Sequence, residues 1–341
     1  MTPATFPTVT IQNSGHQFQV RPSQTVLEAA IDAGVNLSYG CRNGACGACK
    51  GKVVSGKVMH DDFQGSAISD AELAAGQALF CCARPLEDLV IECRELSGVA
   101  GIKPRLLPVR VQKKEQLTAD VMVLFLQLPA SERLQFVAGQ YLEFILKDGK
   151  RRAFSIANAP HDDTLIELHL RLIAGGQFTQ YVFDEMPEKA ILRIEAPLGT
   201  FYLREESSKP IIFVAGGTGF APIKGIIEHM IHQGMQREVV LYRGGRVEHD
   251  LYMHALCERW AEFLPHFTYI PVLSDEPADT QWQGRTGLVH EAVLADYPDL
   301  SAYEAYVCGA PGMVEIAHQT FVQQGLDADA FFSDAFTFAP K

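Results

Sequence analysis

The sequence predicts a multidomain chain with three folds in succession: a small mixed α/β domain, an antiparallel β-barrel domain and an α/β doubly wound domain. Residues 8–92 contain short strands and helices on either side of a cluster of cysteines. Residues 108–196 contain many short strand candidates joined by turns, a pattern typical of a barrel. In residues 210–324, apolar strand-length runs alternate with helical stretches, which indicates a parallel sheet covered by helices.

With 341 residues, the chain is long enough for two or three domains with ordinary cores. Its hydrophobic content of 47% and charged content of 21% are typical of a globular protein. The longest apolar runs have the length of strands, well below the ~18 residues of a membrane span. The N-terminus lacks the basic and apolar regions of a signal peptide. We therefore expect a cytoplasmic protein with no membrane partner, and we expect a monomer.

The net charge of −12 is spread over the chain without a basic stripe. This charge argues against nucleic acid as a partner. It permits electrostatic docking to a protein with a basic face, although simple solubility explains it equally well.

The cysteines gather in one glycine-rich loop. Cys41, Cys46 and Cys49 are spaced C-x4-C-x2-C, and Cys81 follows at a distance. Four thiolates with this spacing hold a [2Fe–2S] cluster of the plant type. A disulfide framework would suit a small secreted domain, and structural zinc usually shows paired C-x2-C units. The residue types leave the fourth ligand open between Cys81 and Cys82, and we choose Cys81 because the surrounding run resembles ferredoxins, in which the first of these positions is the ligand.

The residues around the cluster loop predict the following elements: a hairpin over 8–20, a helix from the capping box Thr25–Glu28 to Gly34, a strand over 52–55, a short helix starting at Ser69–Glu72, and a strand over 89–92. This order resembles the β-grasp fold of plant-type ferredoxins. We assign residues 1–97 to a plant-type [2Fe–2S] ferredoxin domain. Residues 98–107 contain glycine and proline and are interpreted as a linker.

The barrel, assigned to residues 108–206, has strand candidates at 109–112, 121–128, 141–146, 154–157, 165–172 and 191–196. It contains the run Arg152-Ala-Phe154-Ser155-Ile156. An arginine can neutralise a pyrophosphate, an aromatic ring can stack on an isoalloxazine, and a hydroxyl can reach the flavin N5 atom. The run resembles the R-x-[Y/F]-[S/T]-x-[S/A] motif of the ferredoxin–NADP reductase superfamily, where it binds flavin.

Two further segments follow at that superfamily's spacing: His169-Leu-Arg171 and Gly175-Gly176-Gln-Phe178-Thr179. The resemblance implies that the strand and the glycine turn bring backbone amides and the Thr179 hydroxyl to the flavin phosphates. The alternatives are a hairpin turn at the two glycines and an edge-strand histidine at His169.

The last domain, residues 207–341, is predicted as strand 210–215, helix 222–233, strand 238–242, helix 251–263, strand 267–273, helix 290–295, strand 305–308 and helix 313–324, with a short end. Gly216-Gly217-Thr218-Gly219 lies where a strand ends and a helix begins, so its amides can bind the pyrophosphate of a nicotinamide dinucleotide. It is not the G-x-G-x-x-G fingerprint, but it matches the superfamily's own form.

Three more features complete the expected nicotinamide site. Cys308-Gly309-Ala-Pro311 resembles the superfamily's C-G-x-P element, in which the cysteine borders the nicotinamide. Phe336 resembles the C-terminal aromatic residue that covers the flavin. Arg243 or Arg246 could meet the 2′-phosphate of NADPH, or either could be surface charge, so the choice between NADH and NADPH stays open; we favour NADH because it dominates among similar reductases.

The resemblance then covers the whole chain. The domain order is similar to reductase components of bacterial aromatic-ring oxygenases and phenol hydroxylases, and to CDP-6-deoxyglucoseen reductase. It differs from the phthalate dioxygenase type, where the ferredoxin domain is last and the flavin is FMN, so FAD is implied. The resemblance implies an NAD(P)H-dependent oxidoreductase that passes electrons through FAD and the cluster to a terminal oxygenase, with Ser155 and Cys308 at the hydride transfer. A pyridoxamine-dependent sugar dehydratase as the partner, or a stand-alone flavin reductase, are the alternatives.

Overall fold

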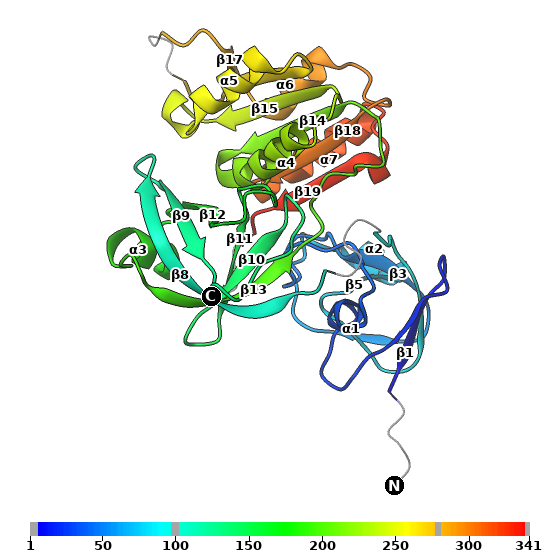
Figure 1. Ribbon diagram of the computed structural model, residues 1–341. Helices are drawn as coiled ribbons and strands as arrows, with labels where there is room; N and C mark the ends of the chain where they lie inside the picture. The colour runs from blue at the N-terminus through cyan, green and yellow to red at the C-terminus, as the bar shows by residue number, and fades with distance from the viewer. Residues whose placement is uncertain (1–5, 97–101, 277–280, 338–341) are drawn as a thin grey trace. The chain divides into compact units, whose positions relative to one another are not determined.

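The computed structural model describes residues 6–96, 102–276 and 281–337 (Figure 1). The chain divides into two compact units between Pro104 and Arg105. The first unit holds the cysteine loop, and the second holds the barrel together with the doubly wound sheet. The predicted end of the first domain, Ser97, lies outside the described residues.

The first unit has a five-stranded sheet in the order β2-β1-β7-β3-β5. Strands β1 and β7 are parallel and β1 and β2 form the predicted antiparallel hairpin. Helix α1 contributes Val26, Leu27 and Ala30 to the same core as the sheet, which is the β-grasp arrangement. The elements are β1 Thr8–Ile11, β2 Gln17–Gln19, α1 Val26–Ala33, β3 Lys50–Ser55, β4 Val58–His60, α2 Asp70–Ala74, β5 Gln77–Leu79, β6 Ala83–Pro85 and β7 Leu89–Glu92, with β4 and β6 paired separately.

Local sequence signals position both helices of this unit. Thr25 forms the predicted capping box at the start of α1, and Ser69 forms one at the start of α2, where the sequence predicted a short helix. Gly34 ends α1 in the left-handed conformation, with φ of 78°. The Lys50 ammonium lies 2.6 Å from Glu72 in α2. This contact and the hydrogen bonds from Ser69 lower the pKa of Glu72 to about 2.

The second unit begins with a six-stranded antiparallel sheet in the order β11-β10-β13-β8-β9-β12, which confirms the predicted barrel. A bridge between Ile156 and Leu168 links its two end strands. The strands are β8 Arg105–Gln116, β9 Val121–Gln127, β10 Tyr141–Ile145, β11 Arg151–Ser155, β12 Ile166–Arg171 and β13 Ile191–Leu198. The predicted linker is too long, because residues 105–107 belong to β8, where Leu107 pairs with Ile194 and is buried in the barrel core.

The doubly wound part has an all-parallel sheet in the order β17-β16-β15-β14-β18-β19. Phe220 of α4 and Trp260 of α5 pack in one core, while Val293 of α6 and Phe321 of α7 pack in another, so helices cover both faces as predicted. The elements are β14 Ile211–Gly216, α4 Phe220–His232, β15 Val239–Gly245, α5 His254–Phe263, β16 Phe267–Leu273, β17 Arg285–Thr286, α6 Val289–Asp296, β18 Glu304–Gly309, α7 Pro311–Gln323 and β19 Phe331–Ala335.

An edge strand of this part goes beyond the sequence prediction. Strand β19 was expected only as a short end. It pairs with β18 so that Asp334 lies beside Cys308. Across the described ranges, the helices lack the combination of length and apolar character needed to cross a membrane.

Candidate functional site

The thiols of the cysteine loop receive backbone N–H groups. The amide of Cys41 donates to the Cys46 sulfur and the amide of Ala45 to the Cys41 sulfur, both at 3.4 Å. The amide of Cys81 lies 3.5 Å from the Cys49 sulfur. Backbone donors aimed at sulfur stabilise thiolate ligands, so the loop fits an iron–sulfur cluster.

Two glycines allow the loop to close. Gly44 has φ of +73°, and a Cβ atom there would lie 2.7 Å from the Cys82 sulfur. Gly47 has φ of +76°, and its Cβ would lie 3.0 Å from the carbonyl oxygen of Ala67. Both the left-handed backbone and the close neighbours exclude larger side chains at these positions.

The four predicted ligands form two pairs, Cys41 with Cys46 and Cys49 with Cys81. The Cys46 thiol lowers the pKa of Cys41 to about 6. Two thiol pairs suit a cluster with two irons better than one zinc ion.

The structure also distinguishes the two adjacent cysteines. The Cys81 backbone faces Cys49, whereas the Cys82 thiol donates to the carbonyl oxygen of Asp62 at 3.6 Å. The two sulfurs lie 3.6 Å apart. These contacts support Cys81 as the fourth ligand, and the assignment stays a prediction.

In the barrel, the two arginines of β11 differ in their partners. Arg151 lies 2.9 Å from Glu143 and also pairs with Glu195. Arg152 donates to the carbonyl oxygen of Arg151 and forms no ion pair with any described residue. A guanidinium without a carboxylate partner can bind the pyrophosphate of FAD.

The other residues of the motif have separate positions. Phe154 is half-buried, and its ring centroid lies 5.7 Å from that of Phe178. Ile156 and Phe178 are both buried in the barrel core. For these two side chains, the structure supports packing in the barrel core, and side-chain contact with FAD is not expected.

The glycine pair leads into a helix that the sequence did not predict, α3 Gln177–Asp184. The left-handed turn at Gly175, with φ of +74°, precedes Gly176, which is the N-cap residue and provides no side-chain cap. The first amides of α3 therefore remain available for an anion. The Thr179 hydroxyl differs from the expectation because it donates to the Gly176 carbonyl and accepts from the Ile173 amide.

His169 and Arg171 on β12 are engaged within the protein. The His169 side chain is fully buried and contacts Glu167 and Tyr252. The predicted contact of the His169 imidazole with FAD is therefore replaced by contacts within the protein. The alternative prediction, a histidine on an edge strand, agrees with the position of β12 at one end of the barrel sheet. Arg171 pairs with Asp120 at 2.9 Å and Asp250 at 3.4 Å.

The glycine loop after β14 forms a short 3₁₀ turn, Gly217–Gly219, that runs directly into α4. A Cβ atom at Gly219 would lie 2.1 Å from the carbonyl oxygen of Cys308, and one at Gly216 would lie 2.7 Å from the Met313 sulfur. The side chain of Thr218 is buried. The loops after β14 and β18 therefore touch through their backbones at the carboxyl ends of the strands, where this type of sheet binds ligands.

Residues from three distant motifs meet beside this loop. The Ser155 hydroxyl lies 3.4 Å from the Asp334 carboxylate, and Asp334 pairs across the sheet with Cys308. The Phe336 amide donates to the Gly309 carbonyl at 2.9 Å. Burial and the Asp334 carboxylate raise the pKa of the Cys308 thiol, which keeps it neutral. The sequence assigned no role to Asp334, because nothing local to it indicates its distant neighbours.

The structure separates the two arginines proposed for a 2′-phosphate. Arg243 is 1% exposed, and its guanidinium stacks 3.9 Å from the centre of the Phe220 ring and donates to the Tyr252 carbonyl. It cannot reach a bound nucleotide, so this expectation is wrong. Arg246 has a side chain that is 80% exposed and lies 3.1 Å from Asp275. Pro311 opens α7.

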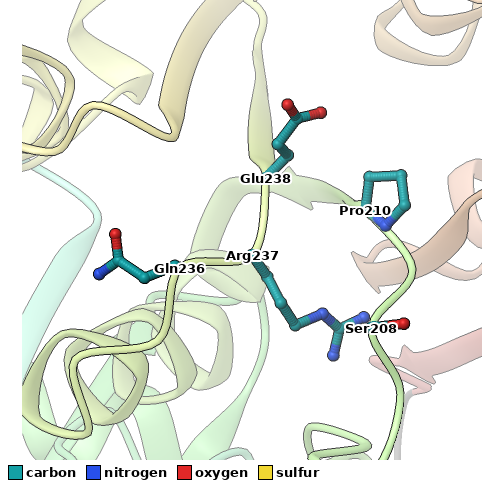
Figure 2. A pocket seen from close by; sticks show the side chains of 5 residues that line it. All are labelled: Ser208, Pro210, Gln236, Arg237 and Glu238. Atoms are coloured by element: carbon teal, nitrogen blue, oxygen red, sulfur yellow. The ribbon is translucent and has the colours of Figure 1, made fainter.

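A hollow of about 410 Å³ lies elsewhere, lined by Ser208, Pro210, Gln236, Arg237 and Glu238 (Figure 2). These residues precede β14 and β15, so the hollow lies at the amino ends of the strands. The Arg237 guanidinium is already bound to the Lys209 carbonyl and to Glu304 at 2.9 Å. This hollow is not the expected nucleotide site.

The chain matches three family models: the 2Fe-2S iron-sulfur cluster binding domain over residues 9–86, the oxidoreductase FAD-binding domain over 108–202 and the oxidoreductase NAD-binding domain over 213–319. It is 38% identical to the CDP-6-deoxy-L-threo-D-glycero-4-hexulose-3-dehydrase reductase of Yersinia pestis, over 96% of this chain and 98% of the relative. It is 33% identical to reductase component 2 of terephthalate 1,2-dioxygenase from a Comamonas species, over 97% of both chains.

Among solved structures, the cytochrome P450 reductase of Amycolatopsis is 34% identical, with a TM-score of 0.82, over 98% of this chain and 99% of that one. The full-length coverage and the three matched domains confirm the resemblance and the cofactors that it implies. The chain therefore belongs to the family of NAD(P)H-dependent iron–sulfur flavoprotein reductases, oxidoreductases that bind FAD and a [2Fe–2S] cluster and deliver electrons to an accepting protein.

Proposed function

We propose that Ser155, Cys308 and Phe336 form the place where NADH gives hydride to the flavin of this reductase. The observation that carries the proposal is their convergence at the carboxyl ends of β14 and β18, although they lie far apart in the sequence. When bound, FAD takes two electrons as hydride and releases them singly, and the [2Fe–2S] cluster carries one.

The residues of the chain have the following proposed roles. The amides of Gly216–Gly219 hold the NADH pyrophosphate, with Gly309 and Pro311 shaping the opposite loop. The Cys308 thiol is buried and neutral, so we propose that it borders the nicotinamide from within the protein, behind the Gly309 turn. Arg152 and the first amides of α3 hold the FAD pyrophosphate. Cys41, Cys46, Cys49 and Cys81 hold the cluster.

The proposed domains are residues 1–97 for the ferredoxin domain, 105–206 for the FAD domain and 207–341 for the nicotinamide domain. The linker between the first two is shortened to residues 98–104, because β8 begins at Arg105. Monomeric state, cytoplasmic location and the lack of nucleic-acid binding stay predictions. Light scattering after gel filtration tests the first of these.

We propose NADH as the preferred donor. One support is the burial of Arg243, which leaves Arg246 as the other candidate to meet a 2′-phosphate. The second support is the ion pair between Arg246 and Asp275, because a carboxylate at this place would repel the 2′-phosphate of NADPH. The ratio of kcat/KM for NADH to that for NADPH tests this, and a ratio below one would contradict it.

For the electron-accepting partner we propose a terminal oxygenase component. The relative from Comamonas supports this by its name. A second candidate is a sugar dehydratase, supported by the higher identity to the dehydrase reductase of Yersinia. Reduction of each purified partner by this protein and NADH distinguishes the two, because only the true partner accepts electrons at a rate comparable to turnover.

The first test of the proposed function is an anaerobic NADH titration of the purified holoprotein, followed by visible absorbance and low-temperature EPR. We expect the flavin to bleach and a reduced [2Fe–2S] signal to appear. A Cys46→Ser variant is the matched control, because it should keep flavin bleaching and lose the cluster signal. Flavin bleaching without a cluster signal in iron-replete wild-type protein would instead indicate a stand-alone flavin reductase.

A further inference from the structure

A buried lysine joins the first helix of the doubly wound part to the barrel. Lys224 of α4 is 6% exposed, and its ammonium lies 3.1 Å from the carboxylate of Glu167 on β12. The same ammonium donates to the Ala157 carbonyl at 3.3 Å and pairs with Glu228 of its own helix at 2.9 Å. Two of its three partners therefore belong to the barrel and one to α4.

The ion pair between Lys224 and Glu167 is the first step in a series of hydrogen-bonded side chains. The second oxygen of Glu167 lies 2.7 Å from Nε2 of His169, and Nδ1 of His169 lies 3.0 Å from the Tyr252 hydroxyl. Burial favours the protonated form of Glu167, but His169 and Lys224 outweigh it and hold its pKa at about 2. A carboxylate only accepts hydrogen bonds, so Nε2 of a neutral His169 donates and Tyr252 donates to Nδ1.

The backbone around the ion pair is tightly packed. A Cβ atom at Gly225 would lie 3.0 Å from the carbonyl oxygen of Asn158, which is tighter than an ordinary van der Waals contact. The Ala157 amide donates to the Glu167 carbonyl at 2.8 Å, and the Asn158 side chain accepts from the Glu167 amide at 2.8 Å. Helix α4 therefore has one packed position against the segment that follows the flavin motif.

This position connects the two halves of the proposed hydride site. Lys224 lies five residues after Gly219 in sequence, roughly 7.5 Å along the helix axis. Ala157 lies two residues after Ser155. A shift of the ion pair would move the glycine loop relative to the flavin strand.

We propose that Lys224 and Glu167 are positioning residues that set the alignment of the nicotinamide with the flavin, an inference that rests on the proposed function. A buried ion pair gains little net stability, because desolvation of both charges offsets their attraction. Its larger effect is to select one arrangement of the two elements, since either charge without the other is strongly disfavoured there. Among the described residues, the hydrogen bonds and ion pairs of these four side chains do not include Ser155 or Cys308, so we assign them no direct part in hydride transfer.

The test uses holoprotein of Glu167→Gln, with Glu228→Gln as the matched control. Both variants remove one carboxylate from Lys224, but only Glu167 lies on the barrel. Anaerobic stopped-flow measures the limiting rate of flavin reduction and the apparent Kd for NADH, while long-wavelength absorbance reports the stacking of NAD⁺ on reduced flavin.

For Glu167→Gln we expect flavin reduction to slow about 10- to 100-fold, because a misplacement near 1 Å has effects of this size. We expect the Kd for NADH and the FAD content to change less than about twofold, and the charge-transfer band to weaken. Glu228→Gln should stay within about twofold of wild type in all four quantities. We expect these twofold limits because the proposal assigns neither glutamate a contact with NADH or FAD.

Equal limiting rates of flavin reduction in Glu167→Gln and Glu228→Gln would overturn the proposal. A slower rate in Glu167→Gln would also overturn it if the FAD content of that variant fell by the same factor. If Glu167→Gln does not fold, the double variant Glu167→Gln with Lys224→Met replaces it, because this variant leaves no buried lysine without its barrel partner. Flavin reduction in the double variant at the wild-type rate would also overturn the proposal. Failure of the proposed function is distinguishable, because wild-type protein would then not be reduced by NADH at all.

Discussion

Replacement of Gly219 by alanine tests the close approach of the two loops that we propose bind NADH. The backbone at Gly219 has φ of −59°, which alanine adopts freely, so the effect is steric alone. The added Cβ would lie 2.1 Å from the Cys308 carbonyl oxygen, whereas ordinary contacts begin at 3.4 Å. The loop and the end of β18 must therefore separate by about 1.3 Å, because the neighbouring atoms are backbone and cannot rotate away.

Overpacking of this kind destabilises a fold by about 1–3 kcal/mol. A displacement of about 1 Å at a hydride site slows the reaction by about 100-fold. We therefore expect Gly219→Ala to lower the thermal midpoint modestly and to reduce the limiting rate of flavin bleaching by NADH by about two orders of magnitude. Stopped-flow absorbance measures the rate, and calorimetry measures the midpoint.

Gly312→Ala is the matched control. Gly312 is the second residue of α7, just after the end of β18, and a Cβ there would meet nothing within 4 Å. The change should leave the bleaching rate within about twofold and raise stability by about 0.4–1 kcal/mol. The reasoning is refuted if Gly219→Ala reduces flavin at the wild-type rate, or if both variants slow it equally.

Three further outcomes follow from the contacts described above. Cys81→Ser should lose most of the cluster iron and the reduced EPR signal, while Cys82→Ser keeps both; the reverse result would move the fourth ligand by one position. Arg152→Ala should weaken FAD binding about 10- to 100-fold in a fluorescence titration, whereas Arg151→Ala, which breaks two ion pairs in the barrel, should mainly lower the thermal midpoint. Glu72→Gln should destabilise the first unit by about 0.5–1 kcal/mol at pH 7, a modest value because the side chain is 40% exposed. Because the pKa of Glu72 is lowered from 4.5 to about 2, this difference should shrink as the pH falls below 4.5, and a constant difference in thermal midpoints would contradict it.

Local chemistry in the sequence was sufficient for the fold class and for the cofactors. The spacing of Cys41, Cys46 and Cys49 reflects a loop that must wrap one cluster. Glycines such as Gly34 and Gly44 mark left-handed turns, and both have the expected positive φ. These signals act over a few residues, so they can be interpreted without knowing what lies across the fold.

Helix α3 and strand β19 were missed for opposite reasons. Helix α3 is short and follows two glycines that also suit a hairpin turn. Strand β19 gains its order from pairing with β18, which its own residues do not indicate.

Tertiary packing decided which similar residues are available for function. Arg243 and Arg246 are equivalent candidates in the sequence, yet one is stacked on Phe220 in the core and the other is exposed beside a carboxylate. The same holds for Arg151, which forms two ion pairs, and Arg152, which forms none with the residues that the structure describes. Burial and partner choice depend on side chains brought from distant segments, so no pattern within a short window can indicate them. The sequence by itself determined the folds and the chemistry of this reductase. Only the tertiary structure decided which charges are buried in ion pairs within the second unit and which are left for the proposed cofactor sites, because those partners come from distant segments.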